Sequence, residues 1–226
     1  MVYVCDAVMG SGKTSATIDY INTHPEDKFI YITPYLDEAD RMIRSCNMVK
    51  FNTPSSKRSA YNNGRDSKLE DVRDLISFGK SIASTHALFK TYDADILMMI
   101  REKGYKLIID ENVEVAESSD DTLNDINMLV ENGFLLENLD KESSVITYEV
   151  NPDKEYGGGR FDTFFKMLES KKLTRSVNGK MNDVEVQYYW TLPPELVNSF
   201  EDVFVLTYLF DNQGLSHMFN MYNIEY

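Results

Sequence analysis

The stretch that decides the fold is Ala7-Val8-Met9-Gly10-Ser11-Gly12-Lys13-Thr14-Ser15. The apolar run before it, residues 1–6, predicts a strand, and residues 15–22 after it predict a helix. Gly10 and Gly12 permit backbone conformations that a side chain would forbid, so the loop amides can turn inward around an anion. A strand, a loop ending in Gly-Lys-Thr and a helix together are typical of a phosphate-binding P-loop.

The residue types in the loop assign a role to each position. The loop amides would surround a phosphate at the positive end of the following helix. Lys13 would reach the β- and γ-phosphates of a nucleotide, and the Thr14 hydroxyl would ligate Mg²⁺. We therefore expect a site for the phosphates of a nucleotide and for Mg²⁺, formed by Met9, Gly10, Ser11, Gly12, Lys13, Thr14 and Ser15.

A second group of polar residues ends a later apolar run. Residues 105–110 (YKLIID) predict a strand that ends in Asp110-Glu111. Downstream of a P-loop, such a pair is typical of the second half of an NTPase site. Asp110 would hold Mg²⁺, usually through water, and Glu111 would orient and deprotonate the attacking water. Lys13, Asp110 and Glu111 are the candidate catalytic residues.

Composition limits the class of protein. The 226 residues suit one large domain or a domain with a substantial insertion. The formal net charge of −14 argues against a protein that coats nucleic acid. Lys50, Lys57, Arg58 and Arg65 gather in and beside the polar loop 52–66, which could be a solvated loop or a contact to a nucleic-acid backbone. Two cysteines make no disulfide framework, and Cys5 is expected to be a small core residue. The sequence has no long apolar run, so we expect a cytoplasmic protein and no membrane partner.

The order of predicted elements indicates an α/β fold. Strands at 28–33, 81–84, 105–110 and 203–206 alternate with helices at 36–46, 68–78 and 85–103, the last of which could run in two pieces. This order predicts a mostly parallel sheet with helices on both faces.

The pattern changes after residue 118. We expect a helix over 123–139 and strands at 144–150 and 184–191, and we interpret 119–200 as an α+β insertion into a domain made of 1–118 and 201–226. Trp190, with Tyr188 and Tyr189, could stack on bases or pack in a core. The tail 219–226 predicts a strand or a linker.

These residues resemble the superfamily 2 helicases, the DExx-box proteins, and in particular phage-type members. The first RecA-like domain of that family begins with Ala-x-x-Gly-x-Gly-Lys-Thr, which residues 7–14 match in full. Its motif II is Asp-Glu-x-x, and this chain has Asp110-Glu111-Asn112-Val113. Val113 stands where strict DEAD and DEAH boxes have Asp or His.

Three further motifs resemble the family only weakly and by position. Motif Ia contacts the nucleic-acid backbone and corresponds to the stretch from Thr33-Pro34-Tyr35 through Arg41. Motif Ib corresponds to Thr85-His86, and motif III, which couples hydrolysis to movement, to Thr207-Tyr208. The resemblance implies a RecA-like P-loop NTPase of bacteriophage DNA replication, in the host cytoplasm. Its partner would be single-stranded or duplex nucleic acid, DNA rather than RNA.

The chain also departs from the family. There is no upstream adenine-reading glutamine motif, and roughly ninety residues separate motif II from motif III, more than one connection needs. No Gln-x-x-Gly-Arg-x-x-Arg run is present, so a second RecA-like lobe would have to be supplied in cis or in trans. Because an arginine finger contributes about a thousandfold to hydrolysis, we expect slow hydrolysis by this chain alone.

Other readings of the same motifs remain open. A thymidine-type nucleoside kinase shares the loop and an Asp-Glu strand end, but usually has a Cys-x-x-Cys zinc lid that this chain lacks. A terminase motor that packages DNA shares both motifs. An ATP-gated binding module without catalysis would use the acidic insertion to recruit a partner.

Overall fold

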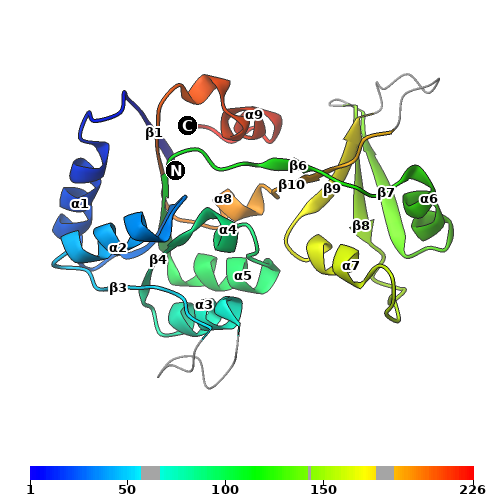
Figure 1. Ribbon diagram of the computed structural model, residues 1–226, viewed down its shortest axis with the longest axis horizontal. Coiled ribbons are helices and arrows are strands. Elements are labelled where there is room, and N and C mark those ends of the chain that lie inside the picture. The colour runs from blue at the N-terminus through cyan, green and yellow to red at the C-terminus, as the bar shows by residue number, and fades with distance from the viewer. Residues whose placement is uncertain (57–66, 142–143, 177–185) are drawn as a thin grey trace. The chain divides into compact units, whose positions relative to one another are not determined.

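The computed structural model describes residues 1–56, 67–141, 144–176 and 186–226 (Figure 1). The basic residues Lys57, Arg58 and Arg65 lie outside these ranges, as does the start of the strand expected at 184–191. The chain forms two compact units. We call Met1–Val113 with Pro194–Tyr226 the parallel-sheet unit, and Glu114–Pro193 the inserted unit. The sequence predicts 119–200 for the inserted part.

The parallel-sheet unit is built on a six-stranded sheet in which all neighbouring strands are parallel. The order β1-β11-β5-β2-β4-β3 places β11, the last strand of the chain, between β1 and β5. The carboxyl ends of all strands therefore meet at one edge, where ligands of open α/β sheets bind. The strands are β1 (Val2–Asp6), β2 (Lys28–Thr33), β3 (Phe51–Asn52), β4 (Ser81–Thr85), β5 (Tyr105–Asp110) and β11 (Val203–Thr207).

Helices cover both faces of this sheet, because parallel strands require crossover connections (Figure 1). On one face, Ile21 of α1 and Met42 of α2 pack with Phe29 and Tyr31 of β2. Ile30 between them is also fully buried and points to the other face, which α3, α4 and α5 cover. This mixed α/β arrangement is the fold class that the sequence predicts. The helices are α1 (Lys13–Thr23), α2 (Leu36–Ser45), α3 (Lys68–Ser77), α4 (His86–Phe89) and α5 (Ala94–Lys103).

The C-terminal part of this unit differs from expectation. After α8 (Glu195–Asn198) and β11, the chain forms a 3₁₀ turn, η1 (Phe210–Asn212), and a helix, α9 (Gly214–Met221). The prediction of a strand or linker for 219–226 is wrong at its start, because Phe219 lies in α9 and is fully buried. Its ring packs against those of Phe210 and Tyr226, with centroids 5.8 and 5.7 Å away.

The position of β1 corrects another expectation. Because β11 and not β1 lies inside the sheet, β1 is an edge strand. Cys5 is consequently exposed rather than a core residue, whereas Cys46, which follows α2, is buried. None of the helices in the described ranges combines the length and apolar composition needed to cross a bilayer.

The inserted unit has an antiparallel sheet of its own, in the order β6-β10-β9-β8-β7. Trp190 is buried in its core, 5.2 Å from the ring of Phe164, and Tyr188 is fully buried, so neither ring is open for base stacking. Tyr189 points the other way and is exposed. The elements are β6 (Ala116–Ser118), α6 (Leu123–Glu131), β7 (Leu135–Asp140), β8 (Val145–Val150), α7 (Asp162–Leu168), β9 (Lys172–Ser176) and β10 (Tyr189–Thr191).

The long helix predicted over 123–139 is wrong in its second half. The helix ends at Glu131, and Gly133 takes a φ of 72° that a helix cannot continue through. The next residues pair with β8, from Leu135 opposite Val150 to Asp140 opposite Val145. The apolar residues of 132–139 continue the helical spacing by chance, but pairing with β8 makes this stretch a strand.

Candidate functional site

Gly10 and Gly12 set the shape of the loop between β1 and α1. Their φ angles are 77° and 91°, a region in which residues with a Cβ are strained. A Cβ added at either position would meet no atom within 4 Å, so the requirement is one of conformation and not of space. Because Gly12 immediately precedes α1, no side chain caps the first amides of that helix. Those amides and the positive end of the helix are available to an anion.

Lys13 is the first residue of α1, and its side chain folds back over the loop. Its Nζ donates a hydrogen bond to the carbonyl oxygen of Ala7 and another, 3.2 Å long, to that of Val8. The ammonium group thus lies where β1 ends, beside the loop amides. Thr14 follows in the first turn of α1 and is half-buried at the edge of the same cavity.

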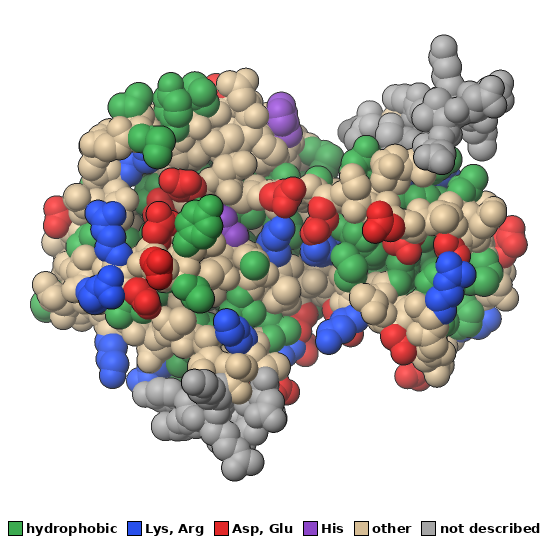
Figure 2. Space-filling model, in the orientation of Figure 1, with side chains coloured by type: hydrophobic (Ala, Val, Ile, Leu, Met, Phe, Trp, Pro, Cys, Tyr) green, Lys and Arg blue, Asp and Glu red, His purple; other side chains and the backbone are tan. Residues whose placement is uncertain are grey.

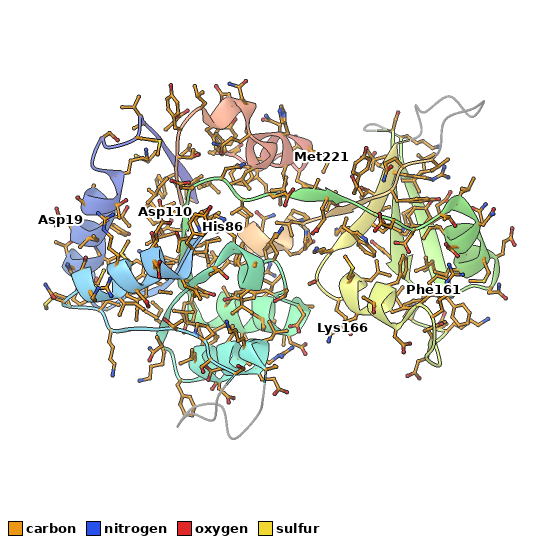
Figure 3. The ribbon with its side chains drawn as sticks, viewed as in Figure 1. Asp19, His86, Asp110, Phe161, Lys166 and Met221 are labelled. Carbon is orange, nitrogen blue, oxygen red and sulfur yellow. The ribbon has the colours of Figure 1, made fainter. Side chains whose placement is uncertain are left out.

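Asp110 ends β5 and is held by residues of two other elements. The Tyr31 hydroxyl, from the neighbouring strand β2, donates to Oδ2 of Asp110. Nε2 of His86, at the start of α4, lies 2.9 Å from the backbone oxygen of Asp110, close by in Figure 3. Since a carbonyl oxygen only accepts, Nε2 must carry a proton for this contact to be a hydrogen bond.

Burial shifts the titration of these groups. Burial raises the pKa of Asp110, although the hydrogen bond from Tyr31 opposes that rise. The same burial raises the pKa of Tyr31 far above its usual range, and the Asp110 carboxylate adds to the effect. Burial also lowers the pKa of His86, which favours the neutral ring. Tyr31 therefore remains a hydroxyl donor to Asp110 at any physiological pH.

Glu111 occupies an unusual backbone conformation next to Asp110. Its φ is 66°, in the left-handed region that residues other than glycine seldom adopt. Its amide donates a 2.9 Å hydrogen bond to the carbonyl oxygen of Leu206 in β11. Such conformations persist only when surrounding contacts fix them, and they are concentrated at functional sites. The exposed carboxylate of Glu111 reaches the cavity beside Asp110.

These groups line one cavity of about 500 Å³ in the parallel-sheet unit. The loop residues Met9–Ser15 form one wall, and Asp110 and Glu111 lie on another. Thr207 and Tyr208, from the end of β11 between β1 and β5, also line it. The structure thus brings together the predicted phosphate loop, the acidic pair and the predicted coupling residues.

The residues that the sequence assigned to nucleic acid lie elsewhere. In the described chain, Thr33, Pro34, Tyr35, Thr85 and His86 are not part of the cavity lining. Thr33 is fully buried and donates to Oε2 of Glu38 at 2.6 Å. Thr85 pairs in register with Thr33 and caps α4 by accepting from the Leu88 amide. Tyr35 is 70% exposed, so it is the most accessible of the group.

Seven other cavity residues were not among the predicted site residues, although Arg41 ends the stretch assigned to motif Ia. They are Tyr31, Glu38, Arg41, Met42, Asn112, Leu206 and Gln213. Gln213 donates from Nε2 to the Thr207 hydroxyl at 2.6 Å and to the Tyr208 carbonyl at 2.9 Å. Two signals in the sequence could have found part of this set. Tyr31 is the hydroxyl-bearing residue in the apolar middle of β2, between Ile30 and Ile32, and Glu38 and Arg41 are three apart on one face of α2.

The side chains of the cavity could supply only part of the coordination shell of a divalent cation such as Mg²⁺. No group of three or more His, Cys, Asp or Glu suited to a metal occurs among the described residues. Thr14 and Asp110 offer a hydroxyl and a carboxylate, and Mg²⁺ typically takes one or two such groups with waters and substrate phosphates. Thr14 and Asp110 are therefore the groups of this cavity that could hold such an ion.

Comparison with known proteins adds one relative. The sequence matches no model of a known protein family. It is 34% identical over 229 residues to the SPbeta prophage-derived uncharacterized protein YonV of Bacillus subtilis (strain 168). That alignment covers 100% of this chain and 53% of the relative, so the chain spans about half the length of the curated relative it matches.

Proposed function

We propose that this chain is the ATP-binding, N-terminal motor lobe of a helicase or translocase that acts on nucleic acid, DNA rather than RNA. The observation that carries the proposal is that one cavity, at the carboxyl edge of a parallel sheet, joins the glycine loop and Lys13 to Asp110 and Glu111. Phosphate-binding and acidic groups at such an edge are what nucleotide hydrolysis requires.

The residues would divide the work as follows. The amides of the loop and Lys13 hold the phosphates, and Thr14 and Asp110 hold Mg²⁺. When bound, Mg²⁺ neutralises charge that develops on the phosphates. Glu111 orients the attacking water and takes its proton, which its exposed carboxylate at the cavity allows.

Thr207 and Tyr208 would couple nucleotide hydrolysis to movement. They line the cavity and are hydrogen-bonded to Gln213, which precedes α9. Nucleic acid would contact Pro34, Tyr35 and Thr85 near the ends of β2 and β4. Thr33 is buried and His86 is half-buried, so these two residues would position their neighbours. Contacts of this kind go to phosphates, so binding should be independent of sequence and weaken with salt.

A second RecA-like lobe, in cis or in trans, would complete hydrolysis by supplying an arginine finger. The greater length of the prophage relative is compatible with such a lobe in cis. That relative also supports a phage origin, and hence action in the host cytoplasm. The isolated 226-residue chain should therefore bind ATP and Mg²⁺, hydrolyse slowly and not unwind duplexes.

The test is nucleotide binding by the purified chain. A fluorescent ATP analogue with Mg²⁺ should bind to the wild type, and Lys13→Ala should lower its affinity by about tenfold or more, because a charged hydrogen-bond donor is lost. Lys50→Ala, which removes an exposed lysine away from the cavity, serves as the matched control. Equal affinity in the wild type and Lys13→Ala would reject the proposal, and thymidine-dependent ADP formation would identify a nucleoside kinase instead.

A further inference from the structure

We propose that Arg41 binds the terminal phosphate of the nucleotide from within this chain. The inference rests on the proposed function, since it assigns a second cation to the same site. Arg41 belongs to α2, away from the glycine loop in sequence, and it lines the same cavity as Lys13.

Arg41 is carried by a helix that is firmly packed. Ala39 and Met42 of α2 are buried against the sheet, in the core that includes Tyr31. Glu38, Arg41 and Met42 reach the cavity from one face of the helix, at the spacing of three and four residues that places side chains together. Packing in the core therefore holds the backbone of Arg41 in place beside the phosphate loop.

The charged residues of the cavity include two cations that could bind the phosphates of a nucleotide. Three carboxylates line it, those of Glu38, Asp110 and Glu111, together with two cations, Lys13 and Arg41. Figure 2 shows acidic and basic side chains next to each other over α2. A nucleoside triphosphate with one Mg²⁺ still carries net negative charge, so a second cation would stabilise it.

The partners of these groups distinguish the two cations. Lys13 donates to the Ala7 and Val8 carbonyl oxygens, and among the acids Glu38 accepts from Thr33 and Asp110 from Tyr31. Within the described residues, the guanidinium group of Arg41 has no hydrogen bond or ion pair. It faces the cavity with its full set of donors, whose planar fork matches the oxygens of a phosphate.

The location of α2 indicates which phosphate Arg41 contacts. This helix follows β2, the neighbour of β5, so it lies on the Asp110 side of the loop. Tyr31 of β2 and Asp110 of β5 are hydrogen-bonded there, and Glu111 follows. The bond to be hydrolysed must lie within reach of Glu111, and Arg41 therefore faces the terminal phosphate rather than the sugar and base.

The test compares two nucleotides that differ at this phosphate. ATPγS and ADP, each with Mg²⁺, are titrated into the wild type, Arg41→Ala and Arg41→Lys. Loss of a charged hydrogen-bond pair should weaken ATPγS about tenfold to a hundredfold in Arg41→Ala and change ADP affinity much less. Arg41→Lys should recover only part of the loss, because an ammonium cannot bind bidentately.

Arg44→Ala is the matched control, since Arg44 is exposed on the same helix but is not among the lining residues. It should bind both nucleotides as the wild type does. If Arg41→Ala matches Arg44→Ala while Lys13→Ala loses binding, the role of Arg41 is refuted and the proposed function stands. Weaker binding of single-stranded DNA by Arg41→Ala, with ATPγS affinity unchanged, would assign Arg41 to nucleic acid instead. Unchanged binding in Lys13→Ala would reject the proposed function itself.

Discussion

Replacing Tyr31 by phenylalanine tests whether a hydroxyl from β2 orients the acidic residue of β5. The substitution keeps the ring, which is buried in the core between the sheet and α2, and removes only the donor to Oδ2 of Asp110. Oδ2 of the half-buried Asp110, at the wall of the cavity, then loses this donor. A hydrogen bond to a charged group contributes about 1.5–3 kcal/mol, and loss of a partner that orients a metal ligand costs about tenfold to a hundredfold in metal affinity.

Tyr105→Phe is the matched control. Tyr105 begins β5, at the opposite end of the strand from Asp110, and its buried hydroxyl donates to the Lys80 carbonyl oxygen at 2.9 Å. Both substitutions remove one buried hydroxyl from the same sheet, so both should destabilise the fold. The loss for Tyr105→Phe should be smaller, about 0.5–1.5 kcal/mol, because its acceptor is neutral.

The assay is a Mg²⁺ titration of ATP binding, run beside urea unfolding for the wild type and both variants. Tyr31→Phe should raise the Mg²⁺ concentration needed for half-maximal ATP binding about tenfold or more, whereas Tyr105→Phe should leave it unchanged. If the Mg²⁺ requirement of Tyr31→Phe equals that of Tyr105→Phe, Tyr31 only stabilises the fold and does not orient Asp110.

Three further predictions follow from the same structure. Gly12→Ala should lower the free energy of unfolding in urea by about 1–2 kcal/mol, since it places a Cβ at a φ of 91°, whereas Gly157→Ala, at a glycine without positive φ, should be near neutral. Glu111→Gln should keep ATP binding and slow single-turnover hydrolysis about a hundredfold or more; an unchanged rate would exclude Glu111 as the base. Burial raises the pKa of the Cys46 thiol to about 11, so its contribution to stability is complete below pH 9 and is lost as the pH rises to about 11. Unfolding in urea over that range should depend less on pH in Cys46→Ala than in the wild type, and at pH 8 iodoacetamide should modify the exposed Cys5 and spare Cys46.

The parts of the fold that local chemistry determines could be predicted from the sequence. The glycine loop and the apolar strand Lys28–Thr33 each follow from residues within a few positions. The parallel sheet follows because strands and helices alternate. The same reasoning failed at Gly133, where a helix stops and a strand begins within two residues, because strand pairing with a distant segment decides that boundary.

The candidate site could be predicted only where its residues form a local motif. Lys13 and Asp110-Glu111 carry recognisable neighbours, but Glu38 and Gln213 do not, and Arg41 only ends a weak motif that was assigned to nucleic acid. They reach the cavity because α2 packs on one face of the sheet and because the chain turns after β11. The exposure of Cys5 could not be predicted for the same reason. No local feature of residues 1–6 shows that β11 will lie between β1 and β5 and leave β1 at the edge of the sheet.

The strand β11 explains why the two halves of the site face each other at all. The amide of Ala7, at the start of the glycine loop, donates to the carbonyl oxygen of Thr207 at 3.0 Å, and the amide of Glu111 donates to that of Leu206 at 2.9 Å. Two adjacent carbonyl groups of β11 therefore set the separation between the loop and the acidic pair. Asp6, just before the loop, also accepts from the amides of Leu209 and Phe210, which fastens the turn after β11 to the same point. A chain that ended before Val203 would contain both motifs in full and would still lack the strand that aligns them, so the site is a property of the sheet and not of the motifs alone.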